Sequence, residues 1–128
     1  MNARYTVLLS MIAGAALGGA AIQGLHAQAK PKAYVISETE AVDAAAQAAY
    51  TPSVRAALSA AGGRSLRTAG GKVTSLEGSA PPKRVGITEW DNLEQAEAFY
   101  KSKAWNDLAP QRDKAQKVIR RYAVEVMN

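Results

Sequence analysis

The pattern of apolar and polar positions changes its period within residues 84–100, RVGITEWDNLEQAEAFY. The first seven residues alternate between two sides of an extended chain, which is the period of a β-strand. From Leu93 onward, apolar residues recur at intervals of three and four, as on one face of an α-helix, and Asn92 is a suitable N-terminal cap. These residues therefore predict a strand that leads directly into a helix.

Residues 33–61 show the same order of strand and helix. The segment AYVISETE at 33–40 predicts a strand whose first half is apolar on both sides, and residues 42–61 carry apolar residues at helical spacing. Thr51-Pro52 is suited to cap and begin a helix, so we expect the helical stretch to break there. Gly62 and Gly63 end it, because the first glycine can adopt the left-handed conformation of a C-terminal cap.

The remaining segments complete an alternating order of strands and helices. Residues 64–69 predict a second strand, Gly70-Gly71 predicts a hairpin turn, and residues 72–76 predict a short return strand. Ser102 can cap another short helix, which is interrupted or restarted at Pro110.

Residues 118–126, VIRRYAVEV, predict the last long strand. One face of this strand is expected to hold Val118, Tyr122, Val124 and Val126, and the other Ile119, Arg121 and Ala123. The full order is β-α-β-β-α-β, which predicts an α+β, ferredoxin-like fold with both helices on one face of an antiparallel sheet.

The second face of such a sheet has no helix to cover it. The segments YVI at 34–36 and YAV at 122–124 are apolar on both sides, and burying each large side chain is worth about 1.5–3 kcal/mol. We therefore expect a two-fold homodimer in which the two sheets meet face to face.

The first 29 residues have the composition of an export signal. Arg4 precedes an uncharged, mostly apolar run over 5–22, and Ala27-Gln28-Ala29 has the A-x-A form that signal peptidases recognise. We expect cleavage after Ala29, a single domain over 30–128, and a periplasmic or secreted protein that is not held in a membrane after cleavage. The alternative is an uncleaved anchor, because an apolar run of this length nearly spans a bilayer core.

The composition excludes several kinds of chemistry. The chain of 128 residues has no cysteine, which rules out disulfides, thiolate zinc sites, iron–sulfur clusters and cysteine nucleophiles. Its one histidine, His26, lies in the expected signal peptide, so the mature chain lacks the usual general base and transition-metal ligand. No phosphate-binding glycine motif or serine triad is present. We therefore expect no metal and no cofactor. We also expect no nucleic-acid partner, because the net charge of +5 is not arranged as a basic stripe with interleaved aromatic residues.

With these elements placed, the chain resembles the bacterial family called domain of unknown function 1330, within the dimeric α/β-barrel superfamily. The resemblance rests on KAYVISETE, on AAGGRSLRTAGG, on EG-x(3)-PPKRV at 77–85 and on DNLEQAEAFYKSKAW, and it covers nearly all of residues 32–126. The leader ending in LHAQA is similar to that of exported members. The resemblance implies a ferredoxin-like fold and face-to-face dimers that form a dimeric α/β barrel, and it implies no established activity.

A pocket in such folds tends to lie between the sheet and the helices, or where two sheets meet. Arg64, at the start of the second strand, could bind a carboxylate bidentately, or it could instead cap the preceding helix or pair with a glutamate. Tyr100, Trp105 and Arg112 could wall a pocket, with core packing as the alternative for the two aromatic residues. For Trp90, at the end of its strand, plain packing is favoured over a place at a pocket mouth.

Two glutamates are candidates for acid–base chemistry. Glu38 and Glu89 lie near the ends of strands that we expect to be neighbours, so their carboxylates could approach and raise one pKa. The alternative is that each glutamate is solvated or paired with an arginine.

Taken together, these features favour an exported dimeric protein that binds a small organic molecule, with an acid as one candidate. One alternative is a cofactor-independent monooxygenase or isomerase, as several relatives in the superfamily are, with Glu38 or Glu89 as the base. Another is an interaction module whose dimer interface is its whole purpose.

Overall fold

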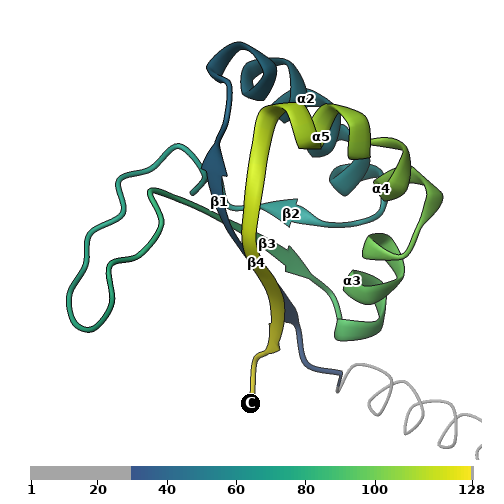
Figure 1. Ribbon diagram of the computed structural model, residues 1–128. Coiled ribbons are helices and arrows are strands. Elements are labelled where there is room, and N and C mark those ends of the chain that lie inside the picture. Colours follow the sequence, from purple (N-terminus) through teal and green to yellow (C-terminus); the bar gives the residue numbers. More distant parts are fainter. Residues whose placement is uncertain (1–29, 128) are drawn as a thin grey trace, which may run out of the picture. The chain divides into compact units, whose positions relative to one another are not determined.

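The computed structural model describes residues 30–127, which contain a four-stranded antiparallel sheet and a layer of helices (Figure 1). The signal peptide expected at 1–29 lies outside the described residues. The elements follow the order β1 (Ala33–Ala41), α2 (Ala44–Ala60), β2 (Arg64–Ser65), β3 (Arg84–Trp90), α3 (Leu93–Tyr100), α4 (Lys103–Asp107), α5 (Ala109–Ala115) and β4 (Gln116–Glu125). The strands lie in the order β2-β3-β1-β4, so the ferredoxin-like prediction is confirmed. None of the helices in residues 30–127 is both long enough and apolar enough to cross a membrane.

The core lies between the sheet and the helices, which are all on one side of it (Figure 1). Trp90 at the end of β3 is fully buried there, as plain packing predicts, and its ring centroid is 5.4 Å from that of Phe99 on α3. Aromatic contacts continue from Phe99 to Tyr100 at 5.0 Å and from Tyr100 to Trp105 at 4.8 Å. Large rings thus fill the layer between β3 and the two short helices α3 and α4.

Side-chain caps fix where the helices begin. The Asn92 side chain accepts a hydrogen bond from the Gln95 amide at 2.8 Å, and the Ser102 hydroxyl accepts one from the Trp105 amide at 3.3 Å. Gly62 ends α2 with a φ of 96°, the left-handed conformation that favours glycine. These three predictions from the sequence are confirmed.

The predicted break at Thr51-Pro52 is wrong, because α2 runs continuously through Pro52. The Thr51 hydroxyl donates to the carbonyl oxygen of Gln47 one turn back, at 2.8 Å. Tyr50 and Leu58, on either side of the proline, are both buried. Packing of the two halves against the sheet therefore outweighs the hydrogen bond that the proline cannot form.

The predicted hairpin over residues 64–76 is also wrong. β2 contains only two residues, it pairs with β3, and residues 66–83 form a long loop without a return strand (Figure 1). Arg67 has a φ of 58°, which interrupts the extended chain. The segment has few apolar residues to bury, and β3 already provides the partner strand for β2.

β4 contains an irregularity that changes the predicted faces. Glu38 of β1 lies opposite Arg120, whereas the next residue, Thr39, lies opposite Val118. One extra residue in β4 forms a bulge at this point, so Val118 shares the face of Thr39 and not that of Tyr122. The predicted faces of residues 120–124 are unaffected.

Candidate functional site

A cavity of about 110 Å³ lies between the sheet and the helical layer. The inward-facing residues of β1 and β3 form its floor, and α2 covers it with Tyr50 and Leu58. The charged residues in its wall are three arginines, Arg55, Arg84 and Arg121, and no aspartate or glutamate lines it. The volume is comparable to the cavities of about 150 Å³ that accept benzene, so the space suits a molecule of only a few heavy atoms.

Arg121 is a partly buried arginine whose guanidinium lies among aromatic rings. Its Nε donates to the Ser37 hydroxyl at 2.8 Å, and its guanidinium carbon lies 4.7 Å from the ring centroid of Trp105 and 5.5 Å from that of Tyr100. Burial lowers the pKa of Arg121, which shows that its positive charge is poorly solvated. Within residues 30–127, Arg121 forms no ion pair, whereas Arg64 and Arg120 each bind a carboxylate. A partly buried guanidinium without a carboxylate favours an anion as its partner.

The structure brings together three of the residues predicted for the site, Tyr100, Trp105 and Arg112. Tyr100 and Trp105 line the cavity and also belong to the aromatic core, so each takes part in packing and in the cavity wall. Arg112 on α5 lies 4.0 Å from the ring centroid of Trp105 and donates from Nη1 to its carbonyl oxygen at 3.2 Å. Trp105 therefore contacts two guanidinium groups, those of Arg112 and Arg121.

Two polar side chains on α2 complete the wall of the cavity. The Tyr50 hydroxyl and the Gln47 Oε1 are buried and have no hydrogen-bond partner among the described residues. Burial raises the pKa of Tyr50, while the Arg112 guanidinium beside its hydroxyl and the charge of Arg121 act in the opposite direction. Tyr50 is therefore a neutral phenol near two cations.

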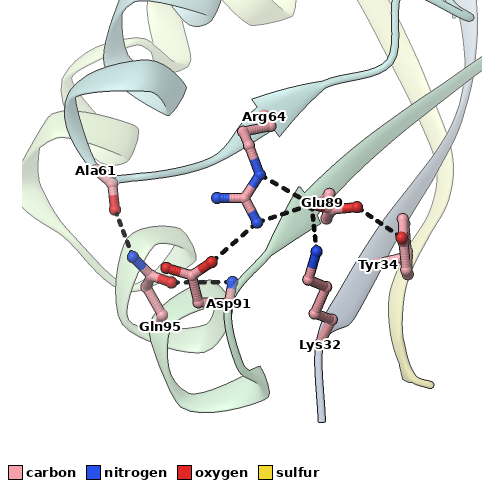
Figure 2. A network of polar contacts seen from close by, with 7 residues as sticks. All are labelled: Lys32, Tyr34, Ala61, Arg64, Glu89, Asp91 and Gln95. Atoms are coloured by element: carbon pink, nitrogen blue, oxygen red, sulfur yellow. Dashed lines mark hydrogen bonds and ion pairs between the residues drawn. The ribbon is translucent and has the colours of Figure 1, made fainter. Parts of the chain in front are cut away.

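Arg64 lies in a separate polar network at the edge of the sheet (Figure 2). Its guanidinium binds Glu89 Oε1 at 2.8 Å and Asp91 Oδ1 at 2.9 Å, and Lys32 and the Tyr34 hydroxyl bind the same glutamate. A hydrogen bond from Tyr34, which has the largest effect, and a second hydrogen bond from Arg64 lower the pKa of Glu89 to about 2. This arrangement matches the alternative interpretation of Arg64, which pairs it with a glutamate.

The expectation that Glu38 and Glu89 approach each other is wrong. β1 and β3 are antiparallel neighbours, but Glu38 lies opposite Val85 and Glu89 lies opposite Tyr34, so the two carboxylates are at opposite ends of the strand pair. Arg120 binds Glu38 and lowers its pKa. Both glutamates lie on the sheet face away from the cavity, since their neighbours Ser37, Thr39 and Thr88 line it.

The sequence predicted only the strand face on which Arg121 lies, and it did not single out Gln47 or Tyr50 as site residues. The signal for Arg121 was present, because it lies between Ile119 and Ala123 on a strand face that is otherwise apolar. Gln47 and Tyr50 gave no comparable signal, since both lie at ordinary spacing on a helix rich in alanine. Within residues 30–127, no group of three or more His, Cys, Asp or Glu side chains is placed to hold a metal ion.

The fold and the cavity define the class of this protein as a ferredoxin-like α+β domain with a small pocket between the sheet and the helices. A solved structure of a protein of unknown function from Rhodopseudomonas palustris has a similar fold, with a TM-score of 0.57 and 14% sequence identity over 76% of this chain and 82% of that one. A "putative Antibiotic biosynthesis monooxygenase" from Chloroflexus aurantiacus matches with a TM-score of 0.45 and 15% identity, over 76% of this chain and 94% of that one. No curated protein matches the chain.

The particular family follows from the sequence itself. Residues 32–127 match the family model described as Domain of unknown function (DUF1330), and the chain belongs to this family. The resemblance noted from the sequence is thereby confirmed.

Proposed function

We propose that the protein binds a small organic anion in the cavity between the sheet and the helices. The observation that carries this proposal is Arg121, a partly buried guanidinium that has no acidic partner among residues 30–127 and lies in a wall with three arginines and no carboxylate of the described residues. A carboxylate would neutralise this charge and accept two parallel hydrogen bonds from the guanidinium fork. Tyr50, which lies near this charge, also lines the cavity.

The experiment measures binding of short-chain carboxylates such as acetate, propionate and butyrate to the purified protein by isothermal titration calorimetry. Arg121→Met should weaken binding at least tenfold, because a charge-assisted hydrogen bond is worth about 1.5–3 kcal/mol. It should not unfold the protein, because Arg121 has no ion pair to lose among residues 30–127 and methionine keeps the apolar length of its side chain. Lys117→Met is the matched control, since it removes one positive charge from an exposed residue of the same strand.

Two outcomes would contradict the proposal. One is that none of these acids binds the wild-type protein. The other is that Arg121→Met and Lys117→Met bind them equally well. Propylamine, a cation of similar size, should not bind, because three arginines repel it.

We also propose that two copies pair through the uncovered face of the sheet, forming a dimeric α/β barrel. Apolar side chains are exposed on this face, with 45% of Tyr122 and 48% of Val124 accessible to solvent. Val124→Glu should convert a dimer into a monomer in sedimentation velocity, because it places a charge in the paired face. Val42→Glu, a change at an apolar residue exposed outside the sheet, should leave the dimer intact. A wild-type protein that sediments as a monomer at micromolar concentration would contradict this proposal.

Export is a further proposal, based on the composition of residues 1–29. It predicts a mature protein that begins at Lys30 in the periplasmic or secreted fraction, which N-terminal sequencing would detect. A full-length chain in the membrane fraction would support the uncleaved anchor instead.

Binding is favoured over acid–base catalysis by Glu38 or Glu89. Each carboxylate has a lowered pKa and an arginine partner, so each is a weak base, and both lie on the opposite sheet face from the cavity. An enzyme that used them would work in the space between two paired sheets. Loss of a measured activity in both Glu38→Gln and Glu89→Gln, with Arg121→Met fully active, would favour that alternative.

A further inference from the structure

We infer that the anion bound by Arg121 is a medium-chain carboxylic acid, whose apolar chain lies in a groove between β4 and the helices α3 and α4. This inference rests on the proposed function, because it assumes that an anion binds Arg121. It adds the apolar part of the ligand, which is inferred from the surface that adjoins the guanidinium.

The groove has a volume of about 400 Å³ and lies beside β4, the strand at one edge of the sheet. Its apolar wall is formed by Val35, Ala96, Tyr100, Trp105 and Ala123. Tyr100, Trp105 and Arg121 also line the cavity of about 110 Å³, so the two spaces adjoin at these three residues. The cavity alone suits only a few heavy atoms, and most of the space beside Arg121 is in the groove.

The Arg121 guanidinium is within reach of a molecule in the groove. Its carbon lies 4.7 Å from the ring centroid of Trp105 and 5.5 Å from that of Tyr100, and both rings wall the groove. Its Nε donates to the Ser37 hydroxyl. Among the described residues, its two terminal nitrogens donate to no acceptor and do not belong to the buried polar atoms that lack a partner, so they are accessible to a carboxylate.

The groove has two further charged residues, Glu97 and Lys101, whose charges oppose each other. Both are exposed, and they are four residues apart on α3 and its C-terminal cap, a spacing at which side chains are neighbours on a helix surface. Their charges sum to zero, whereas Arg121 adds a positive charge that no carboxylate of the described residues binds. A molecule that matches these features has one carboxylate and an uncharged, apolar body.

The experiment measures dissociation constants of propionate, butyrate, pentanoate and hexanoate, which differ only in chain length, by calorimetry with the purified protein. Each added methylene group should tighten binding about two- to fourfold, depending on how much of its surface leaves water. Hexanoate should therefore bind at least about eightfold more tightly than propionate. 1-Hexanol, which has the same chain without the charge, should bind at least about tenfold more weakly than hexanoate.

Two alanine substitutions test where the chain lies. Ala123→Leu should abolish the dependence on chain length and retain binding of propionate, because the larger side chain occupies the groove beside Arg121. Ala123 is exposed, so leucine there leaves the core unchanged. Ala56→Leu is the matched control, since Ala56 is exposed on α2 and lines neither the cavity nor the groove, and it should leave all four affinities unchanged.

The outcomes separate this inference from the proposed function. If the four acids bind with equal affinity, the assignment of the groove is wrong and the anion site at Arg121 stands. A dependence on chain length that persists in Ala123→Leu would also overturn the assignment, as would 1-hexanol that binds as tightly as hexanoate. If none of the acids binds, the proposed function itself fails.

Discussion

Gly63, between α2 and β2, has no room for a side chain, so a substitution there is expected to lower the stability of the fold. A Cβ atom added there would lie 2.8 Å from Cζ2 and 3.0 Å from Cη2 of Trp90, and 3.1 Å from Cγ2 of Thr88. Trp90 is fully buried and packs against Phe99, so its ring has little room to move. The Gly63 amide also donates to the Leu58 carbonyl at 2.8 Å, which holds the backbone in place.

The expected magnitude follows from two opposing effects of Gly63→Ala. Overpacking a well-filled core costs typically about 1–3 kcal/mol. Alanine also reduces the conformational freedom of the unfolded chain, which stabilises by about 0.4–1 kcal/mol where the backbone conformation permits it. The free energy of unfolding should therefore fall by about 1–2 kcal/mol. In a domain of this size each kcal/mol lowers Tm by roughly 4–8 °C.

The assay is urea unfolding monitored by tryptophan fluorescence, with all variants at one protein concentration because association would shift the midpoint. Gly70→Ala is the matched control, since a Cβ atom there meets nothing within 4 Å, and it should be neutral or slightly stabilising. In a Trp90→Phe background the clashing ring atoms are absent, so Gly63→Ala should cost at least 0.5 kcal/mol less than in the wild type. A Gly63→Ala protein as stable as Gly70→Ala would refute the reasoning.

Three further changes test the fold. Glu89→Gln should remove part of the acid dependence of stability. The hydrogen bond from Tyr34 and the pairing with Arg64 lower the pKa of Glu89 from 4.5 to about 2. The ionised Glu89 therefore stabilises the fold above pH 4.5, and this stabilisation is lost as the pH falls through 2. The difference in Tm between wild type and Glu89→Gln should therefore shrink over that range, and a constant difference would contradict the assignment. Asn92→Ala should destabilise by about 1 kcal/mol through loss of the α3 cap, whereas Asn106→Ala, at an exposed position in α4, should be close to neutral in the same urea assay. Pro52→Ala should stabilise by about 1–2 kcal/mol, because alanine restores a hydrogen bond in a helix that is already continuous; a loss of stability would show that the proline is needed where it is.

The elements that the sequence predicted well are those in which local and tertiary preferences agree. At residues 84–100 the strand period, the cap at Asn92 and the burial of Trp90 all favour one structure, and the structure has it. The prediction of a break at Pro52 was wrong, because packing of the helix on both sides of the proline outweighs its local preference. The prediction of a hairpin at Gly70-Gly71 was wrong, because residues that favour a turn do not produce a hairpin when the flanking residues have few apolar side chains to bury.

The candidate site was less accessible to sequence reasoning. Tyr100, Trp105 and Arg112 come together as expected, because they follow one another on consecutive short helices. Arg64 and Arg121 could not be told apart from the sequence, since each lies in a strand. Only the three-dimensional structure shows that Arg64 is neutralised by Glu89 and Asp91, whereas Arg121 is partly buried and has no carboxylate partner among residues 30–127.

Arg120 and Arg121 are successive residues of β4, and the strand directs their side chains to opposite faces of the sheet. Arg120 binds Glu38 on the uncovered face, and Arg121 enters the cavity on the helical side. Either arginine can be substituted without moving the other. Deletion of one residue of β4 outside its bulge would instead move the side chains on one side of the deletion to the opposite face of the sheet.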